Sequence, residues 1–197
     1  MHHGIVPSVE GARRRATYAD VLEAPEHLIA EIIEGELITS PRPAPPHALA
    51  GIAISSILFE RFNAPVGAAD RLGGWWILYE PELHVGDDVL VPDVAGWKRE
   101  RLPAIPNAAF FDIAPDWVCE VISPSSGRID RTRKMPIYAR EHVQHLWLVD
   151  PTARTLEVYR LDADRWIVDS AHGGPDTVHV APFDAAEVDL RRWWGEA

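Results

Sequence analysis

Apolar residues recur at roughly helical spacing between residues 47 and 62, which predicts the longest amphipathic helix of the chain. The residues of this pattern are Leu49, Ile52, Ala53, Ile57 and Phe62. Thr17 and Asp20 have the spacing of a capping box, so we expect a short helix over residues 18–24. A third helix is expected over residues 132–142.

Runs of β-branched and aromatic residues predict six strands, at 75–79, 89–97, 117–122, 145–149, 155–161 and 166–168. Glu34-Gly35 separates two apolar pairs, Ile32-Ile33 and Leu37-Ile38, and this arrangement predicts a tight hairpin. The proline-rich segment 41–46 is expected to be a loop. The order of elements includes a strand, a helix and a strand late in the chain, which predicts a mixed α/β sheet.

Length and composition favour one globular domain. The chain has 197 residues and a mass of 22.0 kDa, and 47% of its residues are hydrophobic. We expect a flexible N-terminal tail over residues 1–16 and a single domain over residues 17–197. The longest apolar stretch, residues 48–59, is shorter than the roughly 18 residues of a membrane span, so no membrane partner is expected.

The lone Cys119 cannot form an internal disulfide, and the N-terminal residues do not have the order of a secretory signal peptide. We therefore expect a cytoplasmic protein.

The net charge of −11 argues against tight, non-specific coating of nucleic acid, because such binding depends on basic side chains that displace counterions. One window, residues 123–140, is nevertheless basic. It is either a solvated loop and helix face or a local site for a phosphodiester. The eight tryptophans are better explained by packing in a core or a dimer interface than by base stacking.

Two carboxylates interrupt apolar segments that predict strands. Asp93 follows Pro92, and Glu120 lies between apolar residues on a segment where it shares a face with Val118 and Ile122. Acids among apolar residues need a partner because their desolvation is unfavourable, and a divalent metal is the simplest partner for both. Lys134, one of two lysines, is a compact cation that can orient water or stabilise charge on phosphate oxygen.

These motifs together resemble the Uma-two family, which belongs to the restriction-endonuclease-like, or PD-(D/E)XK, superfamily. The matching motifs are Val91-Pro92-Asp93-Val94, the run from Cys119 to Ser125, Asp130 with Lys134 and Tyr138, the run from Leu146 to Asp150, the run from Glu31 to Leu37, and Ser40-Pro41 with His47. The similarity covers roughly residues 17–190. It implies an α/β fold with a restriction-endonuclease-like mixed β-sheet flanked by helices.

The resemblance further implies a metal-dependent phosphodiesterase. Asp93 and Glu120 would bind Mg²⁺ or Mn²⁺, with the backbone carbonyl of Val121 as a third ligand, and Lys134 would orient the attacking water or stabilise the phosphate oxygens. The sequence departs from the superfamily at Ile122, where a lysine usually lies. Lys134 on the following helix is then the candidate lysine, and Pro136 predicts that this helix begins late or is kinked.

Four other residues are candidates for supporting roles, each with a structural alternative. Glu31 is either an extra carboxylate near the metal or an exposed strand charge, and His47 is either a substrate contact or a surface residue. Ser123 and Tyr138 either hydrogen-bond the site or cap and pack, and the second interpretation is favoured. The acidic residues Glu80, Glu82, Asp87 and Asp88 are expected in a solvated turn, although one of them could reach the metal.

The leading hypothesis is a Mg²⁺-dependent endonuclease that acts on nucleic acid, expected to be DNA, and that forms a homodimer. The alternative is a catalytically inactive nucleic-acid-binding or regulatory module of the same fold. A third hypothesis is a metal-dependent hydrolase of a small phosphoester.

Overall fold

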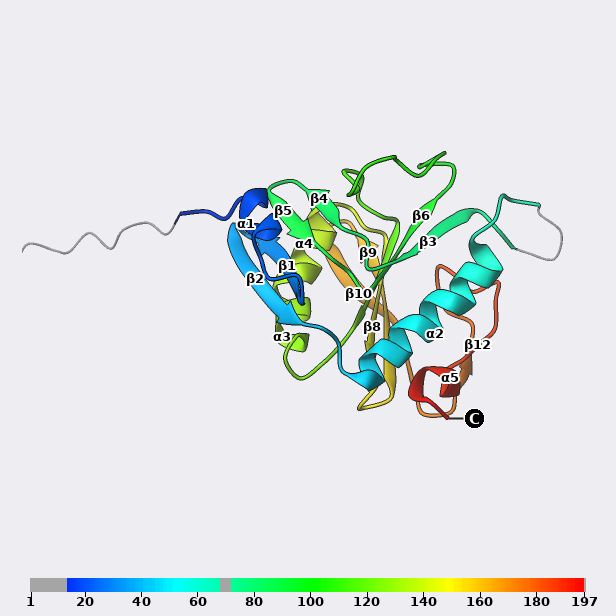
Figure 1. Cartoon of the computed structure of the whole chain (residues 1–197). Helices are drawn as coiled ribbons and strands as arrows, with labels where there is room; N and C mark the ends of the chain where they lie inside the picture. Colours follow the sequence, from blue (N-terminus) through cyan, green and yellow to red (C-terminus); the bar gives the residue numbers. More distant parts are fainter. Residues whose placement is uncertain (1–13, 68–71, 197) are drawn as a thin grey trace, which may run out of the picture.

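The computed structural model describes residues 14–67 and 72–196, and its centre is a six-stranded mixed sheet (Figure 1). The strand order is β10-β9-β8-β7-β6-β3. The bounds are β3 (Trp75–Tyr79), β6 (Val94–Lys98), β7 (Trp117–Val121), β8 (His145–Asp150), β9 (Thr155–Asp162) and β10 (Arg165–Gly173). Strands β7 and β8 are parallel, and the other neighbouring pairs are antiparallel.

Two smaller sheets and the helices complete the architecture. One sheet has the order β2-β1-β5-β4 and the other pairs β11 with β12. Their bounds are β1 (Leu28–Ile33), β2 (Glu36–Pro41), β4 (Leu83–Val85), β5 (Asp88–Leu90), β11 (Thr177–Val178) and β12 (Val188–Asp189). The helices are α1 (Tyr18–Leu22), α2 (Pro45–Phe62), α3 (Gly127–Ile129), the π-helical turn η1 (Asp130–Lys134), α4 (Met135–Arg140) and α5 (Arg191–Trp194).

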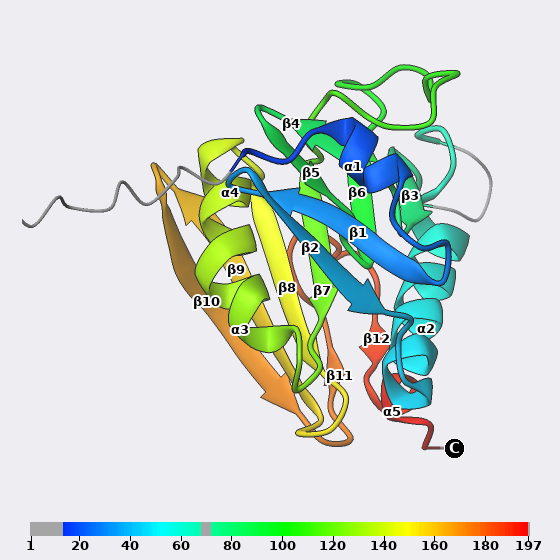
Figure 2. The ribbon, with the colours of Figure 1, turned by 60° about the vertical axis from the view of Figure 1, so that its left-hand side comes forward.

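The central sheet separates two hydrophobic layers. Helices α2 and α5 lie on one face of the sheet, and α4 and the β1–β2–β5–β4 sheet lie on the other (Figure 2). Side chains of β7 alternate between these layers, since Trp117 and Cys119 belong to the first core and Val118 to the second. Glu120 therefore points to the layer that contains α4, as the alternation predicts.

The predicted mixed sheet and the late crossover are confirmed, because the helical segment between the parallel strands β7 and β8 connects them. The tryptophans are also accounted for. Trp97, Trp117, Trp147 and Trp193 are at most 1% exposed. They fill the two cores as expected, so the excess of tryptophan does not by itself indicate a dimer interface.

The N-terminal predictions hold with shifted bounds. Helix α1 ends at Leu22 rather than at residue 24. The hairpin is confirmed, and Glu34 and Gly35 take positive φ angles of 56° and 81°, as its tight turn requires. Helix α2 begins within the proline-rich segment, at Pro45. A proline is tolerated in the first helical turn, because the backbone N–H that it lacks would have no hydrogen-bond partner within the helix there.

The strand predicted over residues 89–97 is wrong as a single element. The chain leaves the smaller sheet after β5, passes through Val91-Pro92-Asp93, and enters the central sheet as β6. Pro92 has no N–H for a strand ladder, which explains why the pairing stops there. Asp93 consequently lies in the crossing between the two sheets and not within a strand.

The helix predicted over residues 132–142 instead extends from residue 127 to 140. Its π-helical turn η1 ends at Lys134, two residues before Pro136, which cannot donate a hydrogen bond to the preceding turn. The helix therefore does not begin late, and helical structure continues through the proline.

Of the predicted flexible tail, residues 1–13 lie outside the described residues. Arg14 and Arg15 form ion pairs with Asp20 and Asp87, at 2.6 and 3.1 Å. Within residues 14–67 and 72–196, every helix is too short or too polar to span a lipid bilayer.

Candidate active site

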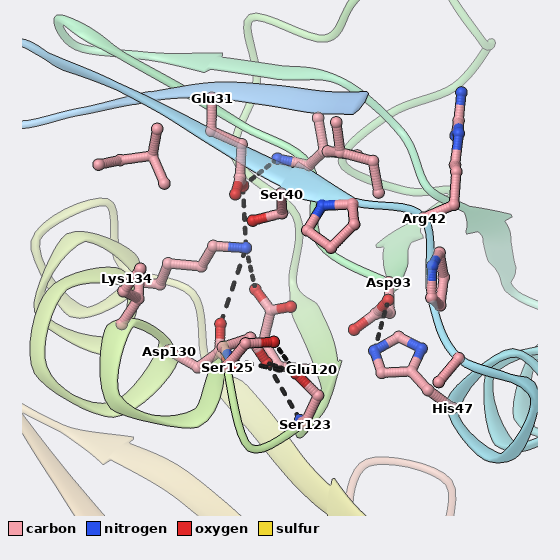
Figure 3. Close-up of a pocket in the computed structure, with 18 of the residues that line it drawn as sticks. Glu31, Ser40, Arg42, His47, Asp93, Glu120, Ser123, Ser125, Asp130 and Lys134 are labelled. Carbon is pink, nitrogen blue, oxygen red and sulfur yellow. Dashed lines mark hydrogen bonds and ion pairs between the residues drawn. The ribbon is translucent and has the colours of Figure 1, made fainter. Parts of the chain in front are cut away.

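A cavity of about 320 Å³ lies between the β1–β2 hairpin, the start of α2 and the loop that follows β7 (Figure 3). It is lined by Ile29, Glu31, Ile38, Ser40, Pro41, Arg42, Pro43, Ala44, His47, Val91, Asp93, Glu120, Ser123, Pro124, Ser125, Ser126, Ile129, Asp130 and Lys134. The structure thus brings together six of the seven predicted site residues. The seventh, Tyr138, contacts Glu120 from the core side.

The ammonium group of Lys134 lies among three carboxylates at the floor of this cavity. Its Nζ atom is 2.8 Å from Glu31 Oε1, 3.4 Å from Glu120 Oε1 and 3.8 Å from Asp130 Oδ1. Burial opposes the charge of Lys134, but the three carboxylates outweigh it and raise the lysine pKa well above its usual value. Lys134 is therefore a permanent cation near neutral pH.

Glu120 is held rigidly from two directions. Glu120 is 2% exposed, and its Oε1 atom accepts a hydrogen bond of 2.6 Å from the buried Tyr138 hydroxyl. Burial raises the Glu120 pKa well above its usual value, whereas the Lys134 cation lowers it. Burial, and to a smaller extent the Glu120 carboxylate, also raises the pKa of Tyr138. Its phenol therefore stays protonated and acts as a hydrogen-bond donor.

Glu31 is a buried member of the cluster and not an exposed strand charge. It lies on β1 and is 5% exposed, and its Oε1 atom accepts a hydrogen bond of 2.8 Å from the Val91 amide. This contact attaches the β1 strand to the crossing that carries Asp93. The structure therefore supports the interpretation of Glu31 as a carboxylate of the site and not the one as an exposed strand charge.

Asp93 is fixed to both β7 and α2. Its Oδ2 atom accepts a hydrogen bond of 2.7 Å from the Val121 amide, and its Oδ1 atom lies 3.4 Å from His47 Nε2. Burial lowers the His47 pKa, but Asp93 and the Val121 carbonyl outweigh that effect and raise it. The His47 ring therefore faces Asp93 in the cavity, as Figure 3 shows, and is not a surface residue.

Ser123 lines the cavity, but its hydroxyl hydrogen-bonds within its own loop. The hydroxyl accepts a hydrogen bond of 3.1 Å from the Ser126 amide. The Ser123 amide in turn donates to the Ser126 hydroxyl at 3.1 Å. This reciprocal pair closes the loop before α3, which is the favoured capping role.

Asp130 and Arg42 also line the cavity, although neither was predicted to be a site residue. Asp130 is 3% exposed, and burial raises its pKa while the Lys134 cation lowers it. The separation of four residues between Asp130 and Lys134 was a usable signal, because such residues are neighbours on a helix. Arg42 follows β2 and lies on the cavity rim.

The acidic run before the crossing does not contribute to the cavity. None of Glu80, Glu82, Asp87 and Asp88 lines it. Asp88 is not in a solvated turn as expected, because it is buried and its Oδ2 atom lies 2.9 Å from Arg140 Nη2.

The side chains of the cavity suit a hard divalent cation. Among the described residues, no three His, Cys, Asp or Glu side chains form a ready set of metal ligands. Magnesium, however, is usually held by one or two carboxylates together with water and substrate oxygens. Four carboxylates and three basic side chains, those of Arg42, His47 and Lys134, line the cavity, so it has carboxylate oxygens to offer as ligands.

Comparison with known proteins identifies the family of the chain. The model of the Uma2 (Uma-two) family, described as "Putative restriction endonuclease", matches residues 16–191. The chain belongs to this family. The resemblance drawn from the motifs is thereby confirmed, as is the α/β fold with its mixed sheet and flanking helices.

A solved structure is similar over nearly the whole chain. It is described as a putative nuclease belonging to DUF820 from Anabaena variabilis, and it is 25% identical with a TM-score of 0.72. The match covers 91% of this chain and 98% of that one. No curated protein matches the chain.

Proposed function

We propose that this protein of the restriction-endonuclease-like fold is a metal-dependent endonuclease that hydrolyses phosphodiester bonds of nucleic acid. One observation carries the proposal. Glu120 lies at the floor of a cavity that it shares with Asp93, and the Lys134 ammonium group is 3.4 Å from its carboxylate. Two acids and a cation in one cavity are the groups that this chemistry requires.

Asp93, Glu120 and the Val121 carbonyl would hold Mg²⁺ or Mn²⁺. When bound, the ion would acidify a water molecule and neutralise charge on the phosphate. The raised pKa of Lys134 excludes it as a general base near neutral pH, so its role is to donate hydrogen bonds to water or to a phosphate oxygen. Glu31 and Asp130 orient the ammonium group, Tyr138 orients Glu120, and His47 orients Asp93.

The test is cleavage of supercoiled plasmid DNA and of RNA in the presence of Mg²⁺ or Mn²⁺. We expect cleavage by the wild type, loss of cleavage on chelation of the metal, and loss in Asp93→Ala and Glu120→Gln. Glu157→Gln is a matched control, because this carboxylate lies on β9 outside the cavity. Equal cleavage by the wild type and Asp93→Ala would overturn the proposal.

A catalytically inactive binding or regulatory module is the second candidate. It is favoured by the distance from Lys134 to Glu31, which at 2.8 Å is shorter than the 3.4 Å to Glu120, so the ammonium group is neutralised within the protein. Calorimetric titration separates the candidates. The nuclease binds Mg²⁺ in the wild type and not in Glu120→Gln, whereas an inactive module shows no binding that depends on Glu120.

We also propose that the protein acts in the cytoplasm as a homodimer. The location rests on the lone Cys119, and the dimer rests on the tendency of nuclease folds to pair. Light scattering coupled to size-exclusion chromatography tests the dimer, and a monomer mass across the concentration range would refute it.

A further inference from the structure

The reactive groups lie below the protein surface in a small cavity. Glu120 and Lys134 are only 2% and 5% exposed, at the floor of a volume of about 320 Å³. This volume is at the lower end of the range for small-molecule sites, which begins at about 300 Å³. Segments 41–44 and 123–126 line this volume together with the buried acidic cluster. A recess of this size suits one flexible strand better than a rigid double helix.

Most cations of the basic window beside the cavity, residues 123–140, already have carboxylate partners and are only partly free to hold a duplex backbone. Arg128 is exposed, whereas the other three arginines form ion pairs within the protein. The pairs are Arg131 with Glu157 at 3.1 Å, Arg133 with Glu34 at 3.0 Å and with Glu36 at 2.9 Å, and Arg140 with Asp88 at 2.9 Å. Lys134 belongs to the cavity floor. Duplex binding gains its affinity from many phosphate contacts, and these arginines already have anionic partners.

The cavity walls offer contacts that suit the exposed bases of an unpaired strand. The wall near the rim contains apolar side chains such as Ile38, Pro43 and Pro124 beside the hydroxyl groups of Ser40 and Ser125. Bases of a single strand can lie against apolar surface and hydrogen-bond through their free edges, whereas the bases of a duplex are stacked and their pairing edges are occupied. The basic lining residues among those described are Arg42, His47 and Lys134. Each already lies beside a carboxylate of the protein, so the cavity offers little free positive charge to the many phosphates of a duplex.

We infer that the substrate is an unpaired nucleic-acid strand, either single-stranded or as an unpaired segment within a duplex, and not an intact duplex. The inference rests on the nuclease function proposed above. A stiff intact duplex must bend or lose base pairs to bring one of its phosphates to the recessed cavity floor, and this deformation disfavours duplex cleavage.

Three substrates that share one labelled strand test the inference: the single strand, its perfect duplex, and a duplex with a central unpaired segment. With Mg²⁺ or Mn²⁺, we expect the perfect duplex to be cut at least about tenfold more slowly than the others, because it must be bent or unpaired first. Cuts in the third substrate should lie within its unpaired segment. Equal or faster cutting of the perfect duplex would overturn the inference.

Binding distinguishes failure of the inference from failure of the nuclease function. Fluorescence anisotropy with Glu120→Gln and the same three substrates in Mg²⁺ should give at least about tenfold weaker binding of the perfect duplex. If the wild type cuts none of the three substrates, the nuclease function fails, and the binding ratio alone decides the substrate class. Equal or tighter binding of the perfect duplex would then refute the preference for an unpaired strand.

Discussion

Replacing Lys134 by methionine tests whether the buried cation holds the acidic cluster together. The substitution keeps a long unbranched side chain and removes the positive charge. It leaves Glu31, Glu120 and Asp130 facing one another in a site where the Lys134, Glu31 and Glu120 side chains are only 7%, 6% and 3% exposed. Solvent screening is therefore weak, and the loss is that of a broken buried ion pair.

The expected destabilisation is about 3–5 kcal/mol near neutral pH, because one partner of a buried pair leaves uncompensated charge behind. This is a large part of the roughly 5–15 kcal/mol that stabilises a typical domain. The double variant Lys134→Met, Glu31→Gln should recover part of the loss, since it removes a carboxylate together with its partner.

The loss should depend on pH with a definite sign. Burial already raises the pKa of Glu120 and Asp130, and Lys134 opposes this shift in both groups. Without the ammonium group, the folded variant binds protons that the unfolded chain releases at the same pH. The stability that the variant has lost is therefore largest above the raised pKa values of Glu120 and Asp130. The loss becomes smaller as pH falls through these values toward the ordinary carboxyl range.

Urea unfolding of the wild type and variant at about pH 8 and about pH 5 measures this deficit. Arg131→Met is the matched control, because the Arg131–Glu157 pair is 3.1 Å long but 41% and 31% exposed. An exposed pair of this kind contributes about 0–1 kcal/mol. The reasoning is refuted if Lys134→Met loses no more stability than the control, or loses the same amount at both pH values.

Two further predictions concern the partners of the acidic residues. Tyr138→Phe removes the 2.6 Å hydrogen bond to Glu120 and should lower the free energy of unfolding by about 1.5–3 kcal/mol in urea titrations, with an unchanged value as the contrary result. His47 should titrate by NMR above its usual pKa, and Asp93→Asn should lower that value because the carboxylate next to Nε2 is lost. The His47–Asp93 contact stabilises the fold below the pKa that His47 has in the unfolded chain, and this stabilisation is lost as pH rises through the His47 pKa of the folded protein. An unchanged His47 titration in Asp93→Asn would contradict the role of Asp93 in raising that pKa.

Strand periodicity was enough to place Glu120. Its neighbours on β7 alternate between the two cores, so the side on which its carboxylate lies follows from its position in the run. The capping box at Thr17 and the hairpin at Glu34-Gly35 could be predicted because each depends on contacts between residues close in sequence. The parallel pairing of β7 with β8 followed from the helical segment between them.

Features that depend on contacts distant in sequence could not be read from the pattern. The burial of Glu31 requires β1 to pair with β5, which a local pattern does not reveal. Asp130 and Lys134 lie on a π-helical turn, and the residue pattern does not distinguish such a turn from an ordinary α-helix. Strand β4 has only three residues, which is too short for periodicity to identify.

The segment Val91-Pro92-Asp93 explains why the site could be identified while part of its fold was misjudged. Its apolar flanks predict one continuous strand, but Pro92 ends the pairing and allows the chain to change sheets. In that crossing the Val91 amide donates to Glu31, and the Asp93 carboxylate accepts from Val121. The crossing therefore joins the β1 carboxylate to the strand that carries Glu120. The proline that interrupts the predicted strand is thus adjacent to the contacts that assemble the cavity.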